Sequence, residues 1–330
     1  HLQAEREYIV EEGATLHIEE GVKIIAVYDD IADYILVKQG GKINAVGTPD
    51  KPIVMTSEKE EPGAWGGIHI CGRAHTNAEG GKGSSEIGGA VYGGNDDADN
   101  SGTLQYIRLE YTGFAFDEEH EANGISFYGV GNGTIVDHCQ AYKGSDDGFE
   151  FFGGSVNVSN LVAVSCSDDS FDWTEGWNGK GTNLVAYQEA ESTLGYDCDC
   201  LMECDNNGSN NAATPVAHPV LKNLILVGNG GSKQGIRLRA GTEVEIDNAK
   251  VCGKGQPLTV ETALTENALK NGTSKLTNIT LTAELSSKEG IYTHADFIAV
   301  TSNKVNANLS YSSFEDIRKE CSWMNGSWVK

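Results

Sequence analysis

Residues 123–176 read NGISFYGVGNGTIVDHCQAYKGSDDGFEFFGGSVNVSNLVAVSCSDDSFDWTEG, and one short pattern occurs in them three times. Gly124–Tyr128, Gly148–Phe152 and Ser170–Thr174 each begin with a small residue and then place large apolar side chains at every second position. Because side chains alternate between the two faces of a strand, each segment predicts a short strand with one apolar face. The same pattern fits Gly67–Cys71, Leu201–Asp205 and Gly235–Arg239.

The spacing of these segments predicts the fold. They begin at Gly124, Gly148, Ser170, Leu201 and Gly235, so successive starts are 24, 22, 31 and 34 residues apart. Repeats of this length with unequal loops indicate the coils of a solenoid rather than hairpins or propeller blades. We therefore predict an all-β fold, a single-stranded, right-handed parallel β-helix. One domain would span residues 1–330, with N-terminal coils in 1–66, central coils in 67–281 and a C-terminal cap in 282–330.

Alternation then assigns a face to each side chain. One inward stack is predicted to contain Ile68, Ile125, Phe149, Phe171, Met202 and Ile236, and a second Ile70, Phe127, Phe151, Trp173, Cys204 and Leu238. A second set of strands precedes several of these, with Ile107, Leu109, Cys139, Ala141, Leu161 and Ala163 facing inward.

Composition limits the partners. The formal net charge is −24, from 48 acidic and 24 basic residues, which disfavours nucleic acids and anionic membrane surfaces and suits cations, neutral glycans or basic partners. No apolar run approaches the roughly 20 residues of a membrane span. The first residue is His1 rather than Met, so we expect a processed form that has lost a signal peptide or a lipid-anchor segment upstream.

The cysteines allow disulfides in a secreted chain. Cys198, Cys200 and Cys204 are close enough in sequence for a local bond, and Cys252 could pair with Cys321. Cys139 falls in an inward position and is expected in the core.

Outward positions carry the candidate chemistry. Between the inward stacks lie, coil by coil, His69, Ser126, Glu150, Asp172, Glu203 and Arg237, and the next outward column ends at Asp205 and Arg239. Adjacent coils are about 4.8 Å apart, so Glu150, Asp172 and Glu203 should form a ladder of carboxylates. Like charges directly opposed are unfavourable, and a cation, a shared proton or the two arginines would relieve them.

Each form of relief implies a different role. Asp146, Asp147, Asp168 and Asp169 precede two of the strands and offer oxygen ligands for Ca²⁺, with no organic cofactor expected. A shared proton would make Glu150, Asp172 and Glu203 candidate catalytic acids for glycoside hydrolysis. A polysaccharide lyase would need a base, for which Arg237, Arg239 and His69 are the candidates in these columns. The alternative is structural: the Asp pairs cap their own turns and the outward acids are solvated.

Aromatic residues beside the acids suggest a sugar platform. Tyr128, Phe152, Trp177 and Tyr196 are candidates for partly exposed rings that contact sugar, with core packing as the alternative.

Several longer motifs carry a family resemblance. They are GGKINAVGTPDKPIVMTS (40–57), WGGIHICGRA (65–74), GTLQYIRLEYTG (102–113), NGISFYGVGNGTIVDHCQ (123–140), SDDGFEFFGG (145–154), SDDSFDWTEG (167–176) and CSWMNGSWVK (321–330). Together they resemble a family of bacterial secreted or surface β-helix proteins of the pectin-lyase-like type, common in Bacteroidetes and marine bacteria. The resemblance covers nearly the whole chain and implies an extracellular or outer-surface location.

Three functions remain open from the sequence. The first is a surface β-helix that binds an extracellular polysaccharide or another cell-surface component, with Ca²⁺. The second is a polysaccharide-degrading enzyme that uses the carboxylate ladder, supported if loops 175–200 and 205–220 wall a groove. The third is a fibre that assembles through open coil ends, which a capping segment after Leu281 would oppose.

Overall fold

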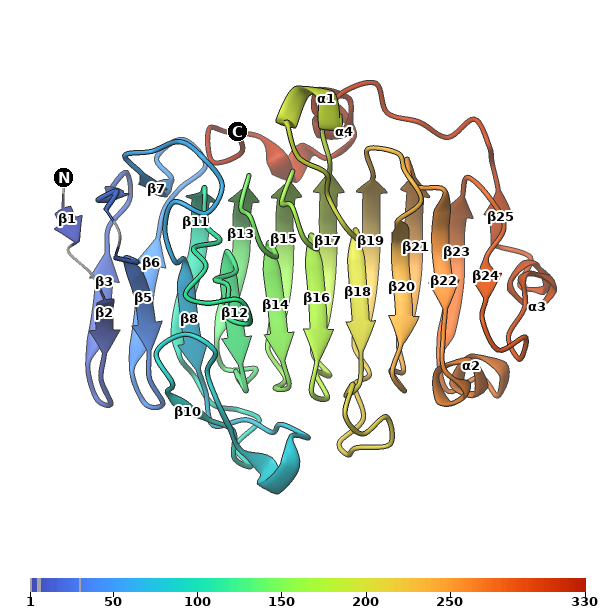
Figure 1. Cartoon of the computed structure of the whole chain (residues 1–330), viewed down its shortest axis with the longest axis horizontal. Coiled ribbons are helices and arrows are strands. Elements are labelled where there is room, and N and C mark those ends of the chain that lie inside the picture. The colour runs from blue at the N-terminus through green and yellow to red at the C-terminus, as the bar shows by residue number, and fades with distance from the viewer. Residues whose placement is uncertain (1, 5–6, 30) are drawn as a thin grey trace.

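The computed structural model describes residues 2–4, 7–29 and 31–330, with side chains from residue 7 onward. Within them the chain winds as a parallel β-helix, and the strands of successive coils lie side by side along the long axis (Figure 1). The predicted fold class is confirmed.

One sheet, called sheet A, has 13 strands in the described part of the chain, all paired in parallel. They are β1 Leu2–Ala4, β3 Thr15–Ile18, β4 Lys23–Ala26, β6 Lys42–Val46, β7 Ile53–Ser57, β11 Gly102–Glu110, β13 Ile135–Tyr142, β15 Asn157–Val164, β17 Lys180–Tyr187, β19 Val220–Val227, β21 Glu245–Cys252, β23 Lys275–Leu281 and β25 Lys304–Val305.

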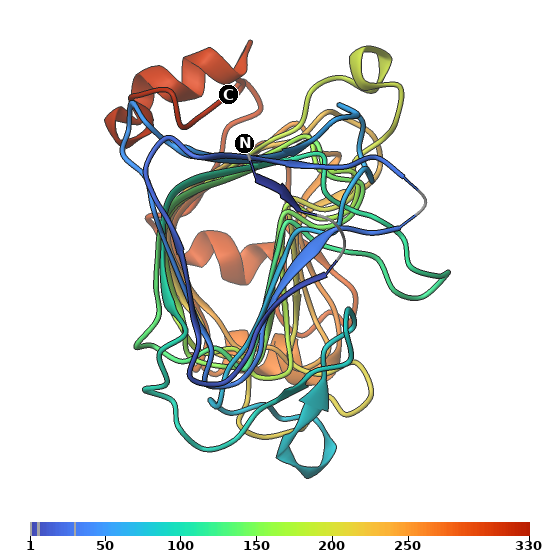
Figure 2. The ribbon, with the colours of Figure 1, turned by 90° about the vertical axis from the view of Figure 1, so that its left-hand side faces the viewer.

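The other sheet, sheet B, has 10 strands in the same described residues, again all parallel. They are β2 Glu7–Val10, β5 Tyr34–Val37, β8 Ile68–Cys71, β12 Ile125–Tyr128, β14 Phe149–Phe152, β16 Phe171–Thr174, β18 Met202–Asp205, β20 Gln234–Arg239, β22 Gln256–Val260 and β24 Ser286–Ser287. Figure 2 looks along the coil and shows the two sheets enclosing a shared interior.

Each long strand of sheet A is bent once. Gly102–Gln105 of β11 pairs with β6 and Ile107–Leu109 pairs with β7, while Tyr106 between them has a positive φ of 52°. The equivalent bends are made by His138, Asn160, Asn183, Asn223, Asn248 and Asn278, all in the left-handed region. Asn tolerates that conformation better than most residues, which explains why the position is rich in Asn.

The interior holds both predicted stacks. Every residue assigned to them lies in one buried cluster, and so do the six inward residues of the second strand set, Cys139 among them. Phe127 and Phe151 stack at 4.9 Å between ring centroids, and Phe149 and Phe171 at 5.6 Å. A β carbon at Gly148 would lie 2.6 Å from the carbonyl oxygen of Ser170, which explains the glycine that opens this strand.

A loop excursion covers part of the outer face of sheet B. It includes the 3-10 turn η1 (Glu79–Gly81) and the antiparallel pair β9 (Gly83–Ser84) and β10 (Val91–Tyr92). Ile87, Ala90 and Tyr92 of this excursion pack with Tyr128 and Phe152 in a second buried cluster. The outer face of sheet B is therefore walled mainly by residues 79–94 over β8, β12 and β14.

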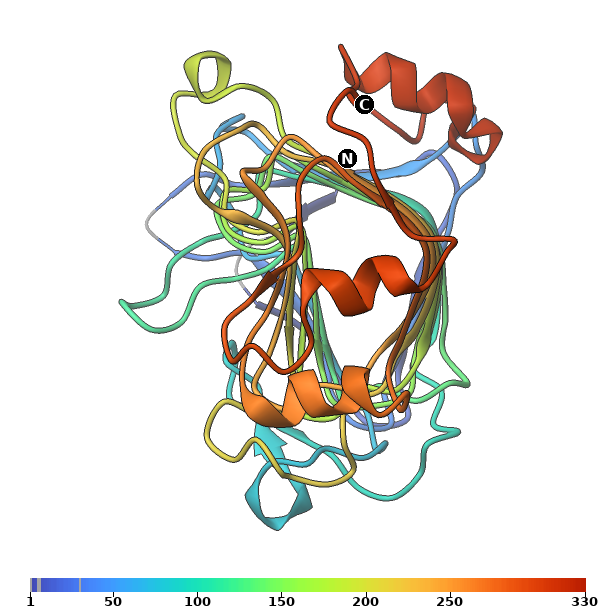
Figure 3. The ribbon, with the colours of Figure 1, turned by 90° about the vertical axis from the view of Figure 1, so that its right-hand side faces the viewer.

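The C-terminal third supplies the helices that close and brace the coil. α2 (Ala263–Lys270) and α3 (His294–Ala299) lie at the C-terminal end, where α3 crosses the mouth of the coil and buries Phe297 in the interior (Figure 3). α4 (Phe314–Glu320) and the turn η2 (Ser322–Met324) return along the outside of sheet A, and α1 (Glu191–Leu194) lies in a loop. Because α3 covers this end of the coil (Figure 3), the structure does not favour fibre growth through it.

All eight cysteines are free and buried, so the predicted disulfides are wrong. Cys204 points into the interior, whereas the Cys200 thiol lies outside the sheet near Asp199 and Gln234, so their sulfur atoms face apart. Cys252 and Cys321 share the buried cluster under the C-terminal segment, as free thiols.

Candidate functional site: a row of carboxylates on sheet B

The predicted column of outward residues is present in register. Ser126 pairs with Glu150, Glu150 with Asp172, Asp172 with Glu203 and Glu203 with Arg237 across β12 to β20. The column follows from two facts, the period of two along each strand and the in-register stacking of coils.

The Asp pairs that precede two strands lie beside this column. Asp147 accepts a hydrogen bond from the backbone N–H of Asp169 at 2.8 Å, and Asp169 accepts one from the N–H of Cys200 at 2.8 Å. The carboxylates of Asp147 and Asp169 therefore hold the backbone of the following coil, whereas Asp146 accepts from the backbone of its neighbour Asp147, as the structural alternative assumed. The side chains of Asp147 and Asp169 are buried.

These acids form four overlapping groups whose ligand atoms all lie within 4.8 Å of one another. The groups are Asp146–Asp147–Asp168, Asp147–Glu150–Asp172, Asp169–Asp172–Glu203 and Asp169–Asp199–Cys200. Each predicted metal-ligating residue and each predicted catalytic carboxylate is a member of at least one group.

Basic residues neutralise one end of the row. Glu203 contacts Arg237 at 3.1 Å and Arg239 at 2.6 Å, and Arg239 also contacts Asp205 at 2.7 Å. The two arginines thus relieve the repulsion between carboxylates at this end of the row, which was one of the three forms of relief expected from the sequence. Their pKa values are raised despite partial burial, because Glu261 stabilises the Arg237 charge and Asp205 the Arg239 charge, and this argues against either as a base.

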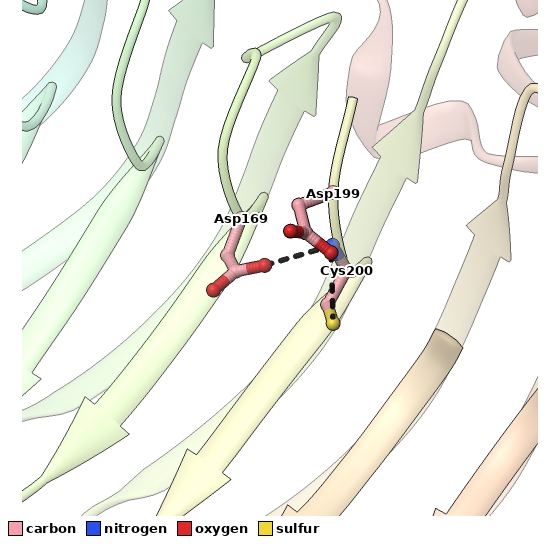
Figure 4. A group of neighbouring side chains, drawn as sticks. All are labelled: Asp169, Asp199 and Cys200. Carbon is pink, nitrogen blue, oxygen red and sulfur yellow. Dashed lines mark hydrogen bonds between the residues drawn. The ribbon is translucent and has the colours of Figure 1, made fainter. Parts of the chain in front are cut away.

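The fourth group is neutralised and hydrogen-bonded internally. Lys233 contacts Asp199 at 2.7 Å, and the Cys200 thiol lies 3.5 Å from Asp199 (Figure 4). Burial, with the charges of Asp169 and Asp199, raises the pKa of Cys200 well above its usual range. The thiol therefore stays protonated and acts as a donor, which does not suit a metal ligand.

The first two groups form no such close ion pair within the described part of the chain. Among the described residues, no Lys, Arg or His forms an ion pair with Asp146, Asp147, Glu150, Asp168 or Asp172. Glu150 accepts a hydrogen bond from the Asn123 amide at 2.6 Å, and Asp147 is the member common to both groups.

Proton affinity reflects this surplus of charge. Burial, then the charges of Asp168 and Glu121, raises the pKa of Asp146 to about 7. Burial, followed by neighbouring carboxylates, also raises the pKa values of Asp147, Glu150 and Asp172 well above their usual range. The row thus binds protons more tightly than free carboxylates do, and it would release them to a cation.

Three of the four predicted sugar-contacting aromatics are buried, so that interpretation is wrong for them. Tyr128 (1% exposed) and Phe152 (6%) lie under the excursion of residues 79–94, and Trp177 (1%) stacks on Phe151 inside the coil at 4.0 Å. Tyr196 is partly exposed, and its hydroxyl donates to the carbonyl of Ser165 at 2.7 Å.

Two further observations concern residues near the row. His69 is buried, and burial lowers its pKa to about 4, which leaves it neutral and remote from solvent. In addition to burial, the negative charge of Glu86 in the excursion raises the pKa of Glu150. The strand pattern could not predict this effect, because Glu86 comes from a loop.

Comparison with protein families gives one result. The family model described as "Pectate-lyase like beta helix domain" matches residues 2–329. No curated protein and no solved structure matches. Among the described residues, none of the helices is both long and apolar enough to cross a membrane.

Proposed function

The chain belongs to the pectate-lyase-like β-helix family, which suggests a carbohydrate-related role, and on that premise we propose that it binds an extracellular glycan through a divalent cation, Ca²⁺ foremost. The cation would lie at Asp147, between the two carboxylate groups that, within the described residues, form no ion pair with a basic side chain. This surplus of negative charge around the buried Asp147 is the observation that carries the proposal.

The donor set fits a hard cation. Asp146, Asp147, Glu150, Asp168 and Asp172 offer only carboxylate oxygens, the ligands that Ca²⁺ prefers in proteins. Ca²⁺ takes six to eight oxygens, so water and glycan oxygens would complete the shell. The bound ion would neutralise the row and give a glycan an electropositive contact on an otherwise acidic surface.

Cleavage of the glycan is a second candidate, and the raised pKa of Asp146 favours it. A carboxyl group with a pKa of about 7 can hold a proton at neutral pH and donate it to a glycosidic oxygen. Oxygen atoms of Glu150 and Asp172 lie within 4.8 Å of each other, near the roughly 5–5.5 Å between the carboxyl groups of retaining glycosidases. Hydrolysis fits better than elimination, because Arg237 and Arg239 are held as cations by their carboxylates.

Titration calorimetry with CaCl₂ at pH 7.5 tests the cation. Asp172→Asn removes one charge without removing a hydrogen bond within the described residues, so we expect about tenfold weaker binding. Asp50→Asn, at an exposed acid far along the sequence, is the matched control and should bind as the parent does. No heat with Ca²⁺, Mg²⁺ or Mn²⁺ would exclude the proposal.

Glycan binding and cleavage are then measured together. Acidic and neutral polysaccharides are incubated with Ca²⁺ or with EDTA, and both retention and released ends are recorded. Retention that needs Ca²⁺ supports binding alone. If new ends are released and either Glu150→Gln or Asp172→Asn abolishes that release, the row is an active site.

A further inference from the structure

The C-terminal segment, residues 309–330, forms a strap over the outer face of sheet A. Ile317, Cys321, Met324 and Trp328 are buried against valines of β15, β17 and β19. The strap is anchored at its far end, where the Gln140 side chain exchanges hydrogen bonds with the backbone of Lys330 at 2.8 and 3.1 Å. This strap lies on a different sheet from the carboxylate row.

Beside the strap runs a ladder of asparagine amides. Asn183 donates to Asn160 at 2.9 Å, Asn223 to Asn183 at 3.1 Å and Asn248 to Asn223 at 2.8 Å. The ladder ends there, because Asn278 of the next coil donates to Asp247 instead, at 2.7 Å. Among the described residues, the amide oxygen of Asn248 accepts no hydrogen bond, and each amide nitrogen has a second hydrogen to donate.

A cavity of about 340 Å³ lies between the ladder and the strap. Its walls include Asn183, Asn223 and Asn248 on one side, and Glu320 and Trp323 of the strap on the other. Its size falls in the usual range for small-ligand sites, roughly 300–1,000 Å³.

The residues that line the cavity indicate which kind of ligand it can bind. The amides provide donors and acceptors in a row, and Trp323 adds an aromatic ring. Lys250 lies 3.0 Å from Glu320, so its charge is already balanced and does not attract an anion. A purely apolar ligand would leave the amides without partners.

Spacing argues against an extended peptide. Ladder amides repeat at the coil distance of about 4.8 Å, whereas a strand presents carbonyl groups on one edge every two residues, about 6.6–6.8 Å. A sugar ring carries several hydroxyl groups within its own width, each both donor and acceptor, and its C–H face packs on aromatic rings.

We propose that this cavity is a saccharide-binding site for neutral sugar chains, which needs no metal and is separate from the carboxylate row. It would hold the protein on a glycan while the row engages another part of that chain or another molecule.

Calorimetry with neutral tetrasaccharides of glucose, galactose and mannose in EDTA tests the site. Asn248→Gly keeps the left-handed backbone (φ 66°) and removes one amide, so we expect binding weaker by about threefold to tenfold. Asn278→Gly is the matched control, since Asn278 is also exposed and left-handed (φ 55°) but does not line the cavity, and its binding should not change. Trp323→Ala should weaken binding by about tenfold, with the melting temperature recorded to show that the strap remains folded.

Three results would overturn the proposal. The first is that no tetrasaccharide binds up to about 10 mM. The second is that Asn248→Gly and Asn278→Gly lose the same amount of sugar affinity. The third is that an extended peptide binds and the sugars do not. Because EDTA is present throughout, no divalent cation contributes to this binding, and failure here is distinguishable from failure of the cation site.

Discussion

Raising the pH should weaken the contribution of the carboxylate row to stability when no divalent cation is present. The carboxylates of the row have raised pKa values in the folded state, so these groups bind more protons in the folded chain than in the unfolded chain above pH 3.8. Their contribution to stability must then fall as the pH rises through the window from the unfolded to the folded pKa. For Asp146 this window runs from 3.8 to about 7.

The magnitude follows from the same residue. Each pH unit corresponds to about 1.4 kcal/mol, so Asp146 alone gives about 4 kcal/mol over the whole window, of which about 2.7 kcal/mol lies above pH 5. Solvent screens its partly exposed carboxylate, and we expect about half of the part above pH 5, about 1.4 kcal/mol. An unfolding entropy of roughly 2.1 cal/mol/K per residue gives about 0.7 kcal/mol/K for this chain, so Asp146 should lower the melting temperature by about 2 °C between pH 5 and pH 8.

Melting curves at pH 5 and pH 8 in EDTA, and at pH 8 with Ca²⁺, measure the effect. Ca²⁺ at about 100 times its dissociation constant should restore about 2.7 kcal/mol, or about 4 °C. Asp146→Asn should reduce the loss between pH 5 and pH 8, and Asp50→Asn, at an exposed acid, should not. The buried His69, whose pKa is lowered to about 4, opposes this loss between pH 5 and its unfolded value of 6.5 in every variant. The test is therefore the difference between variants, and an equal change in melting temperature in the parent and in Asp146→Asn would refute the reasoning.

Three other changes test the structure around the row. Arg239→Met leaves Glu203 and Asp205 with less neutralisation and should destabilise the chain by about 2 kcal/mol at pH 8 and by less at pH 5, in chemical denaturation. Phe151→Ala removes a ring stacked between Phe127 and Trp177 and should cost about 3–5 kcal/mol in the same assay. All eight thiols are buried, so a thiol reagent should label none in the native protein and all of them in denaturant, which mass spectrometry can count.

The sequence was sufficient for the interior and for the register of the carboxylates. Both follow from local rules, alternation along a strand and repetition from coil to coil, and no loop path is needed to apply them. Glu150, Asp172 and Glu203 therefore stack where the pattern predicts.

The exposure of outward residues could not be predicted in this way. Tyr128 and Phe152 do point outward, but the excursion of residues 79–94 folds over them. Trp177 follows the end of a strand, where alternation no longer assigns a face, and it turns inward. The strap that forms one wall of the cavity beside the asparagine ladder comes from residues far along the chain, and its path depends on tertiary packing.

The distribution of charge separates the row from an ordinary acidic surface. Elsewhere, buried acids have partners that stabilise their charge: Glu110 contacts Arg108 and Lys330, and Glu266 accepts hydrogen bonds from three backbone N–H groups and from the Ser287 hydroxyl. Stability alone would favour the same arrangement at Asp147, where several carboxylates share one place and their ionised forms are disfavoured by burial. Places where a sequence departs from such a rule are expected to be functional. The absence of a basic partner at Asp147, within the part of the chain described, is therefore better explained by a ligand that supplies positive charge than by solubility, since solubility requires charge only where water reaches it.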